Sequence, residues 1–229
     1  KNSFVLCLFV SLCQLANAEA NGDLQNRINT IARQADSLTF SKSQTTRKEV
    51  AQAIFDSLDN ILTLEESFYL TFDSFKTVSI QLSQDKKVRI FTWNYFSDTG
   101  NYSVYGILQL NPKYFDDFYY PLTPINRAFD TTHQTLGVDE WYPALYYNIY
   151  SYKYKRKCYY ILTGLHGRNS FINERVVECL ILDKKEEPVF GKAIFYGKDL
   201  KRQPLSRLVY KYSDQATMVC RIEPTEQML

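Results

Sequence analysis

The sequence predicts an α+β fold, in which two N-terminal helices pack on a large antiparallel β-meander sheet that can curl toward a barrel. Aromatic residues make up 15% of the 229 residues, with 18 Tyr and 15 Phe, and such side chains favour strands. Helical spacing is confined to the first part of the chain, and strand-like runs separated by polar turns fill the rest. We divide the chain into a signal peptide (1–18), an N-terminal helical segment (19–64) and an antiparallel β domain (65–229), the last two forming one compact unit.

The N-terminus has the layout of a secretory signal peptide. Lys1 precedes an apolar run from Phe4 to Cys13, and Ala16-Asn17-Ala18 offers a small-x-small cleavage site. The run is too short to cross about 30 Å of hydrocarbon as a helix. We therefore expect an exported protein, periplasmic or extracellular, that does not span a membrane after signal removal. The missing initiator Met and the end just after a strand-like run indicate a chain cut at both ends.

Two amphipathic helices are expected before residue 65. Apolar residues at helical spacing predict the first over 23–38. The stretch Thr46-Arg47-Lys48-Glu49 has the form of a capping box, which predicts the start of a second helix that ends near Leu62. A helix pair alone leaves too little to pack against, so we expect the pair to cover one face of the sheet. The apolar stripes are Leu24, Ile28, Ile31, Ala32, Ala35 and Leu38 in the first helix, and Val50, Ile54, Leu58 and Ile61 in the second.

The first strands are expected after residue 77. Residues 77–83 are typical of a strand, and residues 87–94 alternate between two faces. Gly100 can take a positive φ in the turn at 97–101, before a strand that begins at Tyr102. The alternation places Val88, Ile90 and Thr92 on one face and Arg89, Phe91 and Trp93 on the other, and the next strand has Tyr102, Val104, Leu108 and Leu110 as its apolar side.

The connection over residues 111–143 breaks this pattern. It contains Pro112, Pro121, Pro124 and Pro143, which interrupt regular elements, although a short helix fits within 125–136. A connection this long inside a compact domain is uncommon and is often functional. It is the first place to look for a site, and a plain surface excursion is the alternative.

Strands resume at Leu145 and continue to the end of the chain. The runs 158–163 and 176–182 are apolar on both faces, which predicts central strands covered on both sides. The segment 216–222 alternates cleanly and is expected to be the last strand. Short turns between successive strands predict a meander of roughly eight or nine strands.

Four of these segments carry a resemblance to other proteins: VRIFTWN at 88–94, YYIL at 159–162, PVFGKAIF at 188–195 and RLVYKYS at 207–213. Through them the chain resembles an uncharacterised family of exported proteins from Gram-negative bacteria. The resemblance implies a strand-rich protein whose relatives run further at the C-terminus, and it brings no activity with it. Members tend to have Gly-Trp, a polar residue and Gly where this chain has Gly164-Leu165-His166-Gly167.

Three cysteines remain after signal removal: Cys158, Cys179 and Cys220. An odd number allows at most one disulfide within a monomer. A hairpin could bring Cys158 opposite Cys179, but we favour the interpretation that all three are small buried apolar residues. Their spacing matches no zinc pattern.

Composition and motifs exclude several functions. A net charge of +2 is too small for a nucleic-acid partner. No nucleophile elbow, zinc-protease motif, Walker loop or dinucleotide fingerprint occurs, so no catalytic residue, metal site or cofactor is predicted. Each cysteine lies in an apolar run, which disfavours the reactive thiolate.

The densest aromatic region is the hairpin around residues 146–160, which also carries a basic tip. Tyrosine rings on one exposed face could stack against sugar rings, and the basic residues could meet an anionic group. The alternative is that half of the rings face the core. The candidate ligand-binding residues are Tyr146, Tyr150, Tyr152, Tyr160, Lys155 and Arg156.

These observations favour an exported, non-enzymatic binding or scaffold protein of the cell envelope, whose partner is an envelope protein or a glycan. One alternative is a glycan-binding module that uses the aromatic hairpin face. The other is a hydrolase with a site in the 111–143 connection, around Asp130 and His133.

Overall fold

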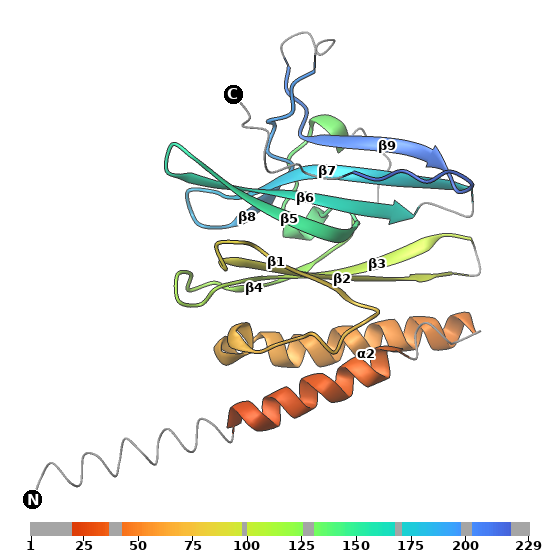
Figure 1. Cartoon of the computed structure of the whole chain (residues 1–229), viewed down its shortest axis with the longest axis vertical. Coiled ribbons are helices and arrows are strands. Elements are labelled where there is room, and N and C mark those ends of the chain that lie inside the picture. Colours follow the sequence, from red (N-terminus) through yellow and green to blue (C-terminus); the bar gives the residue numbers. More distant parts are fainter. Residues whose placement is uncertain are drawn as a thin grey trace, which may run out of the picture.

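The computed structural model describes residues 20–36, 43–97, 100–125, 131–167, 171–197 and 203–220, and these form three layers (Figure 1). Helices form the first layer, a four-stranded antiparallel sheet the second and a five-stranded antiparallel sheet the third. The predicted α+β class with a sheet-rich core is confirmed. The prediction of one large sheet is wrong, because the strands divide into two sheets, and neither is closed into a barrel.

The α-helices come first along the chain, and the strands of the two sheets follow. A helix over residues 20–36 is followed by α2 (Gln44–Leu62) and the 3-10 helix η1 (Glu65–Tyr69). The first sheet has the order β1-β2-β3-β4, with β1 Ser79–Leu82, β2 Val88–Phe96, β3 Tyr102–Leu110 and β4 Tyr119–Leu122. The connection holds η2 (Thr131–His133) and η3 (Val138–Glu140). The second sheet contains β5 Leu145–Tyr154, β6 Lys157–Gly167, β7 Ile172–Leu182, β8 Pro188–Phe190 and β9 Arg207–Ser213.

The helical layer covers the outer face of the first sheet. α2 lies directly on β2, where Trp93 Nε1 donates a hydrogen bond to the carbonyl of Ala51, 3.1 Å away. The predicted apolar stripes are buried, except that Val50 is half-buried and Leu38 lies outside the described residues. The predicted end at Leu62 is confirmed. The capping box is wrong, because α2 already begins at Gln44, so that Thr46 lies within the first turn.

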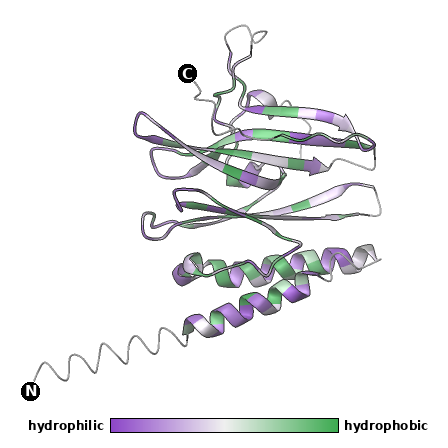
Figure 2. Ribbon diagram, in the orientation of Figure 1, coloured by the Kyte–Doolittle hydropathy of each residue, from purple (hydrophilic) through white to green (hydrophobic). Residues whose placement is uncertain are grey.

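The first sheet is the middle layer, so both of its faces are buried. Val88 and Ile90 pack toward the second sheet, while Phe91 and Trp93 pack against the helices. The predicted alternation along β2 is therefore confirmed, as is the positive φ of Gly100 (78°). Figure 2 shows hydrophobic segments in each of the three layers. Burial of this kind is the main stabilising term for such a fold.

The first sheet ends at an edge strand that contains a proline. Pro121 lies in β4, an edge strand that pairs only with β3, and proline is tolerated at an edge because it cannot donate to a further strand. After Leu122 the chain leaves the first sheet, buries Trp141 between the layers and enters the second sheet at Leu145.

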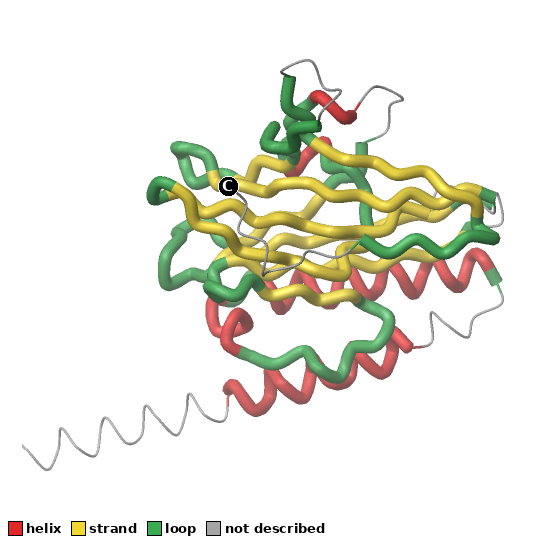
Figure 3. The backbone as a smooth tube through the Cα atoms, turned by 45° about the horizontal axis from the view of Figure 1, so that its top comes forward, coloured by secondary structure: helices red, strands yellow, loops and turns green. Residues whose placement is uncertain are grey.

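The second sheet has β6 and β7 in its interior, as their two-sided apolar pattern predicted. It is not a simple meander, because β8 and β9 share one edge of β7 in succession. The strand predicted over 216–222 is wrong for the described residues 217–220, which pair with no strand. They cross the outer face instead (Figure 3), where Arg175 Nε donates to the carbonyl of Met218 and Tyr147 Oη to that of Cys220.

The three described cysteines form no disulfide with one another. Cys158 is paired with Lys153 and Cys179 with Ile161, so the hairpin does not bring Cys158 opposite Cys179 as considered. Cys158, Cys179 and Cys220 are free. Cys179 is buried, and its burial raises the pKa of its thiol to about 12. Cys158 and Cys220 are half-buried.

Within the described part of the chain, no helix is both long and apolar enough to cross a membrane. The predicted signal peptide lies outside the described residues, so export stays a prediction.

Candidate ligand-binding cleft between the two sheets

A cleft of about 870 Å³ opens between the two sheets, at the end where β3 and β7 begin and β6 ends. β3 supplies Tyr102 and Val104 on one side, and β9 supplies Val209 and Lys211 on the other. The connection between the sheets closes a third side with Leu122, Pro124, Ile125, Thr131, Thr132, Tyr142 and Pro143.

A buried carboxylate lies in this cleft. Glu174, on β7, is only 2% exposed, because strand alternation turns its side chain toward the first sheet. Tyr142 Oη donates a hydrogen bond to Glu174 Oε2 at 2.6 Å. Lys211 Nζ lies 3.9 Å from Glu174 Oε1 while the lysine side chain stays 62% exposed. The cleft therefore contains a buried hydrogen-bond acceptor, Glu174, next to a solvent-exposed donor, Lys211.

A second buried carboxylate, Glu178, lies on the same strand as Glu174 and binds a residue that contacts the cleft lining. Glu178 Oε2 accepts hydrogen bonds from Arg207 Nε at 2.8 Å and is 2.5 Å from Arg207 Nη2, and both side chains are fully buried. Arg207 Nη1 also donates to the carbonyl of Thr131 at 2.6 Å. The guanidinium thus ties β7 and β9 to η2, which carries Thr131 and Thr132 into the cleft lining.

Two aromatic donors complete this buried network. Tyr146 Oη donates to Glu178, and Trp141 Nε1 donates to Tyr146 Oη at 2.9 Å. Burial and the charge of Glu178 raise the pKa of Tyr146 well above its ordinary value. The phenol therefore remains protonated and can keep donating, which satisfies a carboxylate that would otherwise be costly to bury.

Aromatic rings line the open end of the cleft. The Tyr102 ring lies against the backbone of Gly167, where an added Cβ would clash with Tyr102 Cδ2. The ring of His166 is 5.4 Å from that of Tyr142. Gly167 thus gives Tyr102 the room to bridge from the first sheet to the second.

The chemistry of the cleft follows from the residues that line it. No cysteine is among its described lining residues, and its hydroxyl groups come from Ser103, Thr131, Thr132 and the tyrosines. In the described ranges, no group of three or more His, Cys, Asp and Glu side chains could hold a metal ion. Among the described residues, the lining offers aromatic rings, hydroxyls, the imidazole of His166, the buried carboxylate of Glu174 and the ammonium group of Lys211.

The six residues predicted from the aromatic hairpin do not share one surface. Tyr146 and Tyr160 are buried between the sheets, and Tyr160 Oη donates to Asp85 Oδ2 at 3.0 Å. Tyr150 and Tyr152 lie on the outer face, opposite Ile161 and Tyr159. Lys155 and Arg156 form the turn, with φ of 45° and 66°. A bulge between Tyr146 and Asn148 shifts the alternation, and ligand binding by these residues stays a prediction.

The hydrolase hypothesis stays a prediction. Asp130 lies outside the described residues. His133 is exposed beside the cleft, where its Nδ1 is 3.1 Å from Thr132 Oγ1, and it is not part of the lining. The 111–143 connection nevertheless contributes to the cleft, so the segment singled out from its length does meet a candidate site.

Sequence reasoning missed Glu174, Tyr142 and Lys211. A signal was available only for Glu178, in the buried network next to the cleft. The run RVVECLIL places this residue in a strand that is apolar on both faces, and a charge in such a strand needs a buried partner. Nothing local indicates that the partner is Arg207, because β9 reaches the same edge of β7 only after the excursion that contains β8.

The fold and the cleft define a class: an α+β protein with three layers and a polar-lined cleft between two antiparallel sheets. The chain gives no match to a protein-family model, to a curated protein or to a solved structure.

Proposed function

We propose that this chain is a non-enzymatic binding protein that takes a neutral saccharide in the cleft between its two sheets. The observation that carries the proposal is the cleft of about 870 Å³, in which the buried Glu174–Tyr142 pair lies beside the ring of His166 and Tyr102 is also part of the lining. Its volume lies within the ~300–1,000 Å³ of sites for small ligands.

The lining matches saccharide chemistry. A sugar ring presents apolar C–H faces that pack on aromatic rings, and its hydroxyls need both donors and acceptors. Glu174 supplies acceptor oxygens, Lys211 supplies donors, and the hydroxyls of Thr131 and Thr132 do either. Because Glu174 and Lys211 balance in charge, the cleft favours a neutral ligand over a strongly charged one.

Export supports the same proposal, because free glycans and glycan polymers are met at the cell surface. The evidence for export is the layout of residues 1–18. Sequencing the N-terminus of the protein recovered from the native cells tests it: a mature chain that begins at Glu19 is expected, and a chain that keeps residues 4–13 would contradict it.

A glycan array followed by titration calorimetry tests the binding. Tyr102→Ala removes a ring from the cleft, and Glu174→Gln removes the charge while keeping an acceptor for Tyr142. Tyr210→Ala is the matched control, since this exposed tyrosine lies on β9 between the two residues that line the cleft. We expect at least tenfold weaker binding for the two cleft variants and no change for Tyr210→Ala.

The same titration separates the proposal from glycan binding on the outer aromatic face. Tyr150→Ala removes an outer-face ring and leaves the cleft intact. Loss of binding in Tyr150→Ala with wild-type affinity in Tyr102→Ala would contradict the cleft and favour the outer face. A protein that binds no array glycan would contradict both.

A further inference from the structure

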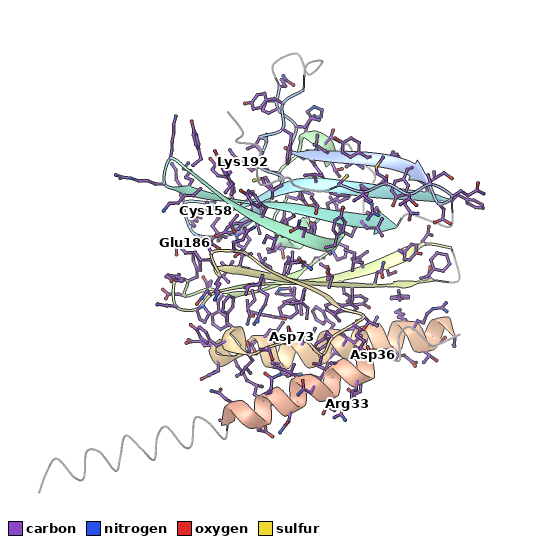
Figure 4. The ribbon with its side chains drawn as sticks, viewed as in Figure 1. Arg33, Asp36, Asp73, Cys158, Glu186 and Lys192 are labelled. Carbon is purple, nitrogen blue, oxygen red and sulfur yellow. The ribbon has the colours of Figure 1, made fainter. Side chains whose placement is uncertain are left out.

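A second pocket, of about 490 Å³, lies at the opposite end of the strands from the cleft. Several hairpin ends meet there: the start of β2, the β5–β6 turn and the β7–β8 turn. Figure 4 labels two of the residues that line it, Cys158 and Lys192, at one end of the second sheet.

Five cationic side chains line this pocket. They come from four separate segments of the chain and comprise Lys87, Arg156, Lys157, Lys184 and Lys192. Within the described part of the chain, none of the five lies within 4.0 Å of a carboxylate oxygen. The whole protein has a net charge of only +2, so the concentration of charge here is local.

The nearby carboxylates are engaged elsewhere. Asp183, the one acidic residue of the lining, accepts hydrogen bonds from the backbone N–H groups of Lys185 (2.7 Å) and Glu187 (3.1 Å). Asp85 accepts from Ser83 Oγ and from Tyr160 Oη. Glu186 and Glu187 lie in the same turn as Asp183 but outside the lining. Among the described residues, these acids form no ion pair with the five cations, and Lys87 Nζ lies 4.7 Å from the centroid of the Tyr114 ring.

The rest of the lining is partly apolar. It includes the half-buried residues Phe115, Ile181 and Leu182 together with Cys158. Clustered like charges repel one another, so an anion at the rim relieves the repulsion, while an apolar chain covers the half-buried side chains. The cationic residues therefore fit an anionic group, and the apolar residues fit an apolar chain.

We propose that this pocket binds an amphiphilic anion, with its apolar chain inside and its carboxylate or phosphate head among the five cations. A free fatty acid and a lipid with a phosphate head share this chemistry. The site is independent of the saccharide cleft, because the two lie at opposite ends of the strands and share no lining residue.

The free thiols provide a site-resolved assay in the wild-type protein. Cys158 lines the pocket, whereas Cys220 is half-buried on the outer face of the second sheet. Alkylation by N-ethylmaleimide is followed at each thiol by peptide mass spectrometry. The additions are decanoate, decyl phosphate or decanol, each below its micelle concentration.

We expect decanoate or decyl phosphate to slow alkylation of Cys158 at least fivefold and to leave Cys220 unchanged. The stronger of the two anions identifies the preferred head group. Decanol should protect Cys158 far less, because it lacks the charge. Equal protection by decanol, equal slowing at Cys220, or no protection by either anion would overturn the proposal.

Charge variants test the rim separately from the thiol. Lys184→Gln with Lys192→Gln removes two exposed cations from the pocket, and Lys48→Gln with Lys76→Gln removes two exposed lysines elsewhere. Both pairs change the net charge equally, and all four lysines are exposed. The rim pair is expected to weaken protection of Cys158 by the anion about tenfold, and the control pair to have no effect. Equal effects of the two pairs would show that only overall charge matters.

Discussion

Replacing Arg207 by methionine tests whether the buried ion pair holds the second sheet and the cleft together. The guanidinium donates a hydrogen bond from Nε to Glu178, approaches the same carboxylate within 2.5 Å through Nη2, donates to the carbonyl of Thr131 and lies 5.1 Å from the Tyr142 ring. In Arg207→Met, Tyr146 is the only described residue that still donates a hydrogen bond to the fully buried carboxylate of Glu178. Removing one partner of a buried pair costs about 3–5 kcal/mol of unfolding free energy.

The cost is measured by urea unfolding followed by circular dichroism. With a slope of about 2 kcal/mol per molar urea, the midpoint should fall by roughly 1.5–2.5 M. Lys211→Met is the control on the same strand, because its exposed ammonium is 3.9 Å from Glu174, and a change within about 0.5 kcal/mol is expected.

A double-mutant cycle isolates the pair. Glu178→Gln keeps an acceptor for Tyr146, and when it is combined with Arg207→Met no buried charge remains uncompensated. The double variant should be more stable than the sum of the single effects predicts, by about 1–3 kcal/mol. Additive effects, or a cost below about 1 kcal/mol for Arg207→Met, would refute the reasoning.

Three further predictions concern packing, backbone and thiol chemistry. Gly164→Ala should destabilise the fold by about 1–3 kcal/mol in the same urea assay, because the new Cβ would lie 2.9 Å from Tyr146 Cδ1; wild-type stability would contradict the packing. Glu186→Gly should stabilise it by roughly 1 kcal/mol, since residue 186 has φ of 66° and glycine adopts such angles without strain; a lower urea midpoint would count against this. Cys179, whose burial raises its thiol pKa to about 12, should resist N-ethylmaleimide at pH 8.5 until urea unfolds the chain, and rapid labelling of the folded protein would oppose the assigned burial.

The elements that sequence patterns predicted best are those governed by local periodicity. The stripes from Leu24 to Ile61 gave both helices, and the alternation along β2 separated Val88 and Ile90 from Phe91 and Trp93. The start of α2 was less predictable, because the cap motif at Thr46 competes with a helix that simply extends one turn further.

The division into two sheets could not be read from local patterns, because strands apolar on one or both faces fit either arrangement. The division becomes clear only in the three-dimensional structure, where the strand that contains Pro121 forms an edge of the first sheet and Trp141 is buried between the two sheets. The six predicted ligand-binding residues lie on different faces for a similar reason. The bulge after Tyr146 turns that ring inward, while Tyr150 faces outward.

Amide chemical-shift mapping of the wild-type protein shows whether the cleft between the sheets binds a saccharide. On titration with the best array glycan, we expect shifts concentrated at Ser103, Glu174 and Lys211, with little change along the outer face. Shifts centred on Tyr150 and Tyr152, with the cleft amides unmoved, would contradict it.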